Sequence, residues 1–174
     1  MDNYEKFREI LDTHISGAPK SDSFNEILRI LFSPEEIDIA VHMKFNGRSI
    51  EEVSQASNIS VSESESLLKS MLIKGVINYR NKKGIKLYSL LPVVPGLFET
   101  SMMKNENSIG KEKLAKLWVK YHEEAMIKSL GGMPTPQMRV VPIKDSIHTG
   151  SVILSFEEVS GLIDQASLKH RPEL

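Results

Sequence analysis

Residues Ser49 to Leu90 constrain the fold of this chain more than any other stretch. Two helical patterns, over 50–57 and 61–74, are separated by a turn at Asn58-Ile59. The apolar period then falls from 3.6 residues to about 2, and two short strands flank the loop Asn81–Gly84. Helix, turn, helix and hairpin, in this order, predict a winged helix-turn-helix.

The pattern Ser-x-x-Glu precedes four of the helical patterns in the chain. In a capping box the serine hydroxyl accepts a hydrogen bond from the N3 amide, while the glutamate three residues later accepts one from the N-cap amide. We therefore expect helices to begin directly after four serines: Ser33, Ser49, Ser60 and Ser155.

Helical spacing of apolar residues predicts further helices on both sides of the central stretch. Upstream we expect helices over 4–14 and 24–31. Downstream a short helix is expected to begin within 95–99, and a long amphipathic helix to run from Gly110 to Leu130. The apolar face of this long helix consists of Leu114, Leu117, Trp118, Tyr121 and Ala125.

The C-terminal part of the chain mixes strand and helix patterns. Short strands are predicted at 139–142 and 152–154, and a closing helix follows Ser155 as far as about Ser167. The fold class is therefore mainly α with a small β content, a winged helix-turn-helix plus an α+β C-terminal extension. The predicted divisions are N-terminal helices (1–32), winged helix-turn-helix (33–95) and C-terminal extension (96–174).

The composition is that of an ordinary globular protein, with 174 residues of which 40% are hydrophobic and 26% charged. A net charge of −1 gives the whole molecule no field that would draw it to nucleic acid or to an anionic membrane, so such binding needs a local patch. No apolar run approaches the roughly 18 residues that span a bilayer, and the N-terminal residues are polar. We expect a cytoplasmic protein without membrane contact.

The sequence contains no catalytic constellation and no cysteine. The lack of cysteine excludes disulfides, thiolate chemistry and a cysteine-ligated cluster within these residues. His122–Met126 nearly spells the His-Glu-x-x-His helix of zinc proteases, but Met126 stands where the second histidine ligand is required. We therefore predict no enzyme activity, no metal site and no cofactor bound by this chain.

The predicted hairpin and the end of the preceding helix are rich in cations. No acidic residue occurs between Ser66 and Phe98. Cations in this region could contact nucleic-acid phosphates, and such contacts give a salt-dependent affinity. A basic hairpin is equally the solvated face of a strand pair that must avoid edge pairing. The candidate nucleic-acid contacts are Lys69, Lys74, Arg80, Lys82, Lys83 and Lys86.

The predicted recognition helix argues against sequence-specific DNA binding. Base contacts in this fold come mainly from the N-terminal residues of that helix, which here are Ser60 to Ser66. They include no Arg, Asn or Gln for bidentate base contacts, and Glu63 and Glu65 would face phosphates. Glu63 has a second role as a capping-box residue, whereas Glu65 has none.

Several segments resemble the N-terminal winged-helix module of ferredoxin-like iron–sulfur (4Fe-4S) proteins of anaerobic bacteria and archaea. The similarity covers nearly the whole chain, and its motifs are structural rather than catalytic. The segments that carry it are Ser33–Glu36, Tyr88–Glu99, Arg139–Ile143 and Ile153–Val159. Proteins of this family continue into a cysteine-rich region that ligates clusters. The resemblance therefore implies an iron–sulfur cluster only where such a region follows in the full-length protein.

Two functional hypotheses follow. The first is a non-catalytic winged-helix module that makes protein or domain contacts with an adjacent redox domain of an electron-transfer protein. The second is a winged-helix transcriptional regulator that contacts DNA chiefly through the basic hairpin and forms a homodimer through the long helix at Gly110–Leu130.

Overall fold

The computed structural model describes residues 2–104, 110–132 and 154–169 of the chain. It divides the chain into two compact units, Met1–Thr135 and Pro136–Leu174. Each unit is described separately below. Within the described ranges, no helix is both long enough and apolar enough to cross a membrane.

Polar caps begin the three N-terminal helices of the first unit, which are α1 (Asn3–Asp12), α2 (Asp22–Leu31) and α3 (Pro34–Ala40). The side chains of Asp2, Ser21 and Ser33 each accept a hydrogen bond from a first-turn amide. The box at α3 is complete, because Glu36 Oε2 accepts from the Ser33 amide at 2.8 Å.

The two helices predicted before the hairpin are α4 (Ile50–Ser57) and α5 (Val61–Lys74). A complete capping box at Ser49 starts α4, and Asn58 ends it in the left-handed conformation. At α5 the bond from the Glu63 amide to the Ser60 hydroxyl is present at 3.2 Å, but the structure gives no return bond from the Ser60 amide to the Glu63 carboxylate. The prediction of a full box at Ser60 is therefore only half right.

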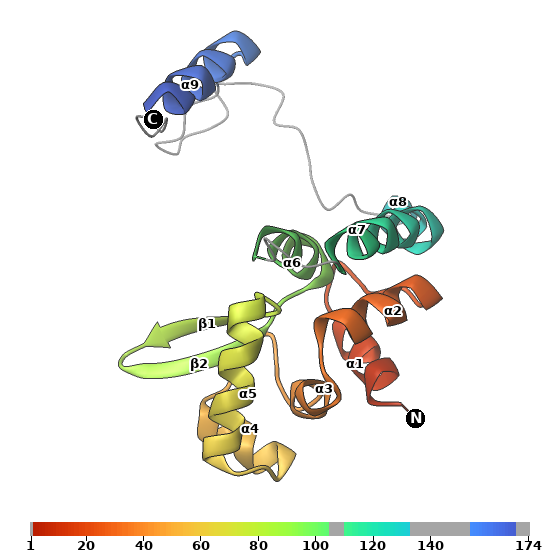
Figure 1. The fold of residues 1–174 in the computed structure, drawn as a ribbon, viewed down its shortest axis with the longest axis vertical. Coiled ribbons are helices and arrows are strands. Elements are labelled where there is room, and N and C mark those ends of the chain that lie inside the picture. Colours follow the sequence, from red (N-terminus) through yellow and green to blue (C-terminus); the bar gives the residue numbers. More distant parts are fainter. Residues whose placement is uncertain (1, 105–109, 133–153, 170–174) are drawn as a thin grey trace. The chain divides into compact units, whose positions relative to one another are not determined.

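The hairpin consists of β1 (Ile77–Lys82) and β2 (Ile85–Leu90), paired antiparallel with Lys82 opposite Ile85 (Figure 1). The turn is thus two residues long, shorter than the predicted loop. Both Lys83 and Gly84 have positive φ, at 53° and 85°, as a tight hairpin turn requires. On the other side of β2, the backbones of Arg48 and Tyr88 exchange hydrogen bonds of 2.9 and 2.8 Å.

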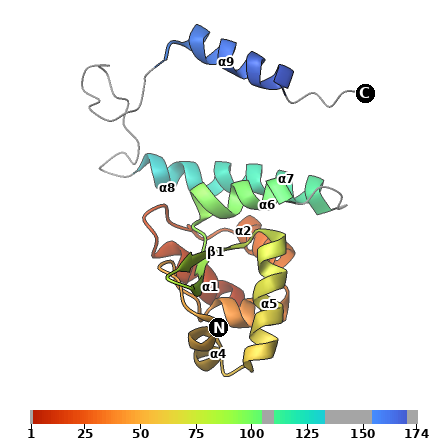
Figure 2. The ribbon, with the colours of Figure 1, turned by 90° about the vertical axis from the view of Figure 1, so that its left-hand side faces the viewer.

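Helices α6 (Phe98–Lys104), α7 (Gly110–Tyr121) and α8 (Ile127–Gly131) follow the hairpin, after a non-helical turn at Val94–Gly96. A π-helical turn, η2 (His122–Met126), joins α7 to α8, so that helix extends over the whole predicted range from Gly110 onward (Figure 2). The wider turn adds a residue to the repeat. As a result Met126, five positions after Tyr121, is fully buried, whereas Ala125 is only partly buried.

One hydrophobic core extends from α1 to η2 in the first unit. The predicted stripe of α2, Phe24, Ile27, Leu28 and Leu31, is buried throughout. Helix α7 packs against α2, with the Tyr121 ring stacked on Phe24 at 4.5 Å between centroids. The predicted apolar face of the long helix is therefore covered within the chain. A dimer through this helix would have to use its opposite face.

The described part of the second unit is α9 (Phe156–Lys169) with the two residues before it. Its capping box is complete, with the Ser155 amide donating to Glu158 at 2.7 Å and the Glu158 amide donating to Ser155 Oγ at 3.2 Å. The side chains of Phe156 and Leu162 are exposed.

The prediction of a mainly α protein with a small β content is confirmed. The strand predicted at 139–142 and the first two residues of the one at 152–154 lie outside the described residues. Both predicted divisions, at 32/33 and 95/96, fall inside the first compact unit, and the three-part division stays a prediction. The finer assignment of a winged helix also stays a prediction.

Candidate functional site

Four of the six predicted cations on α5 and the hairpin are both exposed and unpaired among the described residues. Lys69 is on the exposed side of α5, and Lys82, Lys83 and Lys86 are on the hairpin, of which the end near the turn is exposed on both faces. Among the described residues, no carboxylate forms an ion pair with any of these four. Their ammonium groups are therefore available to a ligand.

Lys74 has a structural role instead. Its Nζ lies 2.5 Å from Glu36 Oε2, and Glu36 is only 2% exposed. The same carboxylate accepts hydrogen bonds from Ser70 Oγ at 2.7 Å and from the Ser33 amide at 2.8 Å. Glu36 thus closes the capping box of α3 and ties α3 to the end of α5. Because Lys74 neutralises a buried charge, it is a poor candidate for phosphate contact.

Arg80 is also engaged within the chain. Its Nη2 donates to the Asn46 carbonyl at 2.6 Å, which connects β1 to the segment before α4. The six cations that the sequence groups together therefore separate into two kinds. Lys74 and Arg80 hold the hairpin and α5 in place, and the remaining four are exposed and unpaired.

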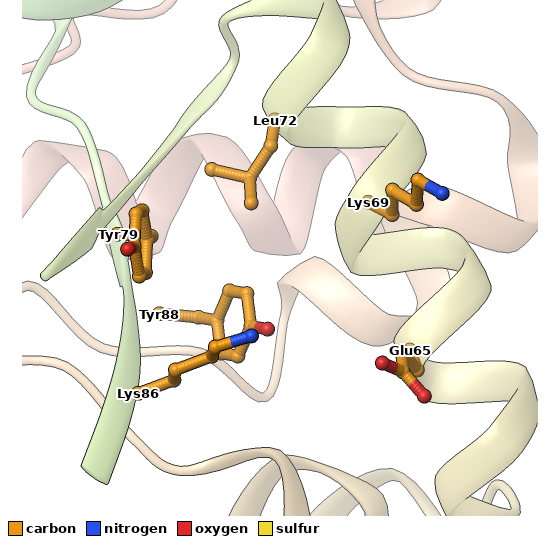
Figure 3. Close-up of a pocket in the computed structure, with 6 residues that line it drawn as sticks. All are labelled: Glu65, Lys69, Leu72, Tyr79, Lys86 and Tyr88. Carbon is orange, nitrogen blue, oxygen red and sulfur yellow. The ribbon is translucent and has the colours of Figure 1, made fainter. Parts of the chain in front are cut away.

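A groove of about 330 Å³ lies between α5 and the hairpin (Figure 3). Lys69 and Glu65 line it from α5, and Lys86 lines it from β2. Tyr79 of β1 and Tyr88 of β2 also line it, with their rings tilted at 40° and 6.3 Å between centroids. Tyr79 is 46% exposed, whereas Tyr88 is buried. The full lining is Glu65, Lys69, Leu72, Tyr79, Lys86 and Tyr88.

The sequence pointed to Lys69 and Lys86 as candidate phosphate contacts and to Glu65 as a residue that opposes DNA binding. It did not single out Tyr79 or Tyr88. The alternation along the hairpin contains the missing signal, because the cross-strand pair Tyr79–Tyr88 puts both rings on one face of the sheet. That face is the one turned toward α5, as the groove lining shows. The acidic N-terminal part of α5 is exposed, as predicted, at Glu63 and Glu65.

A second, wider groove of about 800 Å³ lies between the start of α4 and β2. Its apolar part comes from Ile50, Ile85 and Leu87, and Glu51 and Glu52 border it. Ile85 is 57% exposed near the hairpin turn. The hairpin therefore has a groove on each side, and Lys86 lines both. Of the two, only the groove beside α5 is lined by the two tyrosines.

The histidine-glutamate segment of the long helix serves the packing of α7. His122 Nδ1 lies 2.7 Å from the Trp118 carbonyl oxygen, and the His122 ring stands edge-on to Phe98 at 5.0 Å between centroids. Met126, where a zinc protease has its second histidine, is in the core. In the described ranges, no three His, Asp or Glu side chains are grouped so as to hold a metal ion. Burial raises the pKa of the Tyr121 phenol far above its ordinary value, so this hydroxyl stays protonated.

Comparison of the chain with protein-family models, with curated proteins and with solved structures gives no match.

Proposed function

We propose that this chain is a non-catalytic winged-helix module that makes protein or domain contacts. The proposed setting is the cytoplasmic iron–sulfur redox protein that the sequence resemblance implies. The order α3, α4, α5 and hairpin, with Arg48 paired to Tyr88 beside β2, supports the winged-helix assignment. In this arrangement α5 is the recognition helix and the hairpin is the wing.

The observation that carries the proposal is the charge of the exposed N-terminal part of α5. This surface, which in a DNA reader offers donors to base edges, offers Glu63 and Glu65 here. Two carboxylates close to phosphates oppose binding, and the four unpaired lysines of α5 and the wing offset them only in part. A protein partner can place donors against the carboxylates and acceptors against the lysines.

The second candidate is a DNA-binding regulator, and the exposure of Lys82, Lys83 and Lys86 favours it. Phosphate contact through a basic wing needs no base reading, so it predicts weak binding with little sequence preference. With Lys74 and Arg80 engaged within the fold, three wing lysines and Lys69 remain for phosphates. The expected slope of log affinity against log salt is then no steeper than about −4.

A salt titration of binding to a mixed-sequence DNA duplex separates the two candidates. Fluorescence anisotropy is measured for the natural chain and for Lys82→Glu with Lys83→Glu. We expect weak binding that is lost at physiological salt. Submicromolar binding at that salt, abolished by the double substitution, contradicts the protein-contact proposal and favours the regulator.

A photo-crosslinking experiment tests the protein contact directly. A benzophenone amino acid replaces Tyr79 or Ile85 on the wing, and a matched control carries it at Ile127, which is 61% exposed on α8. We expect crosslinks in the source cells from the wing positions to an iron–sulfur protein, and none from Ile127. Equal crosslinking from all three positions, or crosslinks to DNA alone, would contradict the proposal.

A further inference from the structure

The groove between α5 and the wing has charged walls around an apolar floor (Figure 3). We propose that it binds an acidic peptide segment of a partner protein, with one apolar or aromatic side chain of that segment as the anchor. This inference rests on the proposed function, since it names the chemistry of the partner that the module contacts.

The charge of the walls selects an acidic segment. Lys69 and Lys86 line the groove from opposite elements, and neither forms an ion pair with a described carboxylate. Lys82 and Lys83 at the end of the wing extend the same sign of charge beyond the groove. Carboxylates on either side of an anchor residue would meet a lysine on each wall, and the surrounding field would speed the encounter.

The floor of the groove selects an apolar anchor. Leu72 is partly buried there, and Tyr79 leaves nearly half of its surface exposed beside the buried Tyr88 ring. An aromatic or large aliphatic side chain seated on these rings would remove that surface from water, which is the main source of binding free energy at a contact of this kind. The volume of about 330 Å³ accommodates one such side chain with its backbone.

Glu65 makes the groove selective against nucleic acid. It lines the groove on the same helix as Lys69, one turn earlier. A nucleic-acid strand has a phosphate at every nucleotide and cannot avoid this carboxylate, whereas a peptide can present a backbone amide to it. A carboxylate and a lysine on α5 opposite a lysine on β2 therefore fit isolated acidic side chains better than a continuous polyanion.

The test is an NMR titration of the isotope-labelled full chain with synthetic peptides of defined sequence. The probe is the capped peptide Asp-Glu-Phe-Asp-Glu, and the controls are Asp-Glu-Ala-Asp-Glu and Lys-Arg-Phe-Lys-Arg. We expect the probe to shift the amide signals of Lys69, Tyr79 and Lys86. The alanine control should bind more weakly and the basic control should leave these signals unchanged.

Two matched double variants localise the binding. Lys69→Glu with Lys86→Glu reverses the charge of the groove walls and should weaken the probe by about tenfold. Lys82→Glu with Lys83→Glu makes the same change of net charge at the wing turn and should weaken it by less than about twofold. Lys69→Gln with Lys86→Gln should give a smaller loss in the same direction, and circular dichroism checks that each variant is folded.

Three results would overturn the inference. These are the absence of shifts at the groove, an equal loss in both Glu variants, and equal affinity for the alanine control. If the probe fails while wing crosslinks to an iron–sulfur protein persist, the groove assignment fails and the proposed function stands. Tight duplex binding that shifts the groove signals and is abolished at Lys82 and Lys83 would overturn both.

Discussion

Helix α7 and the wing are both lysine-rich and both contain aromatic residues, but the structure uses them in opposite ways. On α7, Lys113, Lys116 and Lys120 each lie within 3.5 Å of a glutamate oxygen. On the wing, Lys82 and Lys86 have no such partner among the described residues. Paired surface charges have their partners within the fold, whereas unpaired charges of a single sign leave a local field that can attract a ligand of opposite charge.

The aromatic residues show the same contrast. Trp118 and Tyr121 on α7 are buried against α2, with Tyr121 stacked on Phe24, whereas Tyr79 on the wing remains 46% exposed. The two regions would look alike in composition. Their difference teaches that burial and pairing, rather than residue type, separate a structural surface from one suited to binding.

The largest expected effect tests the structural side of this contrast. Trp118→Ala should lower the free energy of unfolding by about 3–5 kcal/mol, because it empties a large volume between α2, α6 and α7. Tyr79→Ala should cost less than about 1 kcal/mol, since half of the ring is already in water. Urea unfolding followed by circular dichroism measures both, since Trp118 is the only tryptophan and fluorescence is lost with it. Equal costs at the two positions would remove the distinction.

The second effect separates Lys74 from the unpaired cation Lys69 on the same helix. Lys74→Met should cost about 1–3 kcal/mol, because the buried Glu36 carboxylate loses the lysine that neutralises it. Lys69→Met, five residues earlier on the exposed side of α5, should change stability by less than about 0.5 kcal/mol. Urea midpoints of the two variants give the comparison. A stable Lys74→Met variant would return Lys74 to the set of available cations.

Local signals in the sequence predicted most of the helix starts because each depends on few residues. The boxes at Ser33, Ser49 and Ser155 are complete, and only Ser60 lacks its return bond. The apolar spacing in α2 and the change of period at the hairpin were predicted for the same reason, since the period of apolar residues indicates which face is buried. These features give the elements and their order.

Tertiary partners could not be predicted in the same way. Lys74 and Glu36 are 38 positions apart in the sequence, and the residues around neither one predict that they pair. The π-helical turn at His122–Met126, which moves Met126 into the core, has no sequence signal that propensity alone would give. The candidate groove depends on how α5 meets the hairpin. Alternation along the hairpin could have placed Tyr79 and Tyr88 on one face, but the sequence does not show that α5 lies beside that face.

A smaller effect tests whether the lysines of α7 and the wing differ in the sign of their contribution to stability. Lys113→Glu with Lys116→Glu breaks the pairs with Glu26 and Glu112 and should cost about 0.5–1 kcal/mol. Lys82→Glu with Lys83→Glu makes the same charge change where no pair is lost, and should be neutral or slightly stabilising because it relieves like-charge repulsion. Thermal unfolding at low and high salt measures both. Equal destabilisation by the two variants would mean that the wing lysines also support the fold.

The smallest expected effect concerns Glu124, whose carboxylate connects η2 to the start of α2. Glu124 accepts from Ser23 Oγ at 2.5 Å and from Ser21 Oγ at 3.2 Å, and the hydrogen bond from Ser23 is the main cause that lowers the pKa of Glu124 below its ordinary 4.5. A carboxyl group with a lowered folded-state pKa adds stability above its unfolded pKa and loses that contribution as the pH falls through the folded value. Glu124→Gln should therefore have a lower Tm than the natural chain at neutral pH, and the difference should shrink as the pH falls from about 5 to about 3. Glu123→Gln, at the exposed neighbouring position, is the matched control, and a difference in Tm for Glu124→Gln that does not change with pH would show that the Ser23 bond does not depend on the charge.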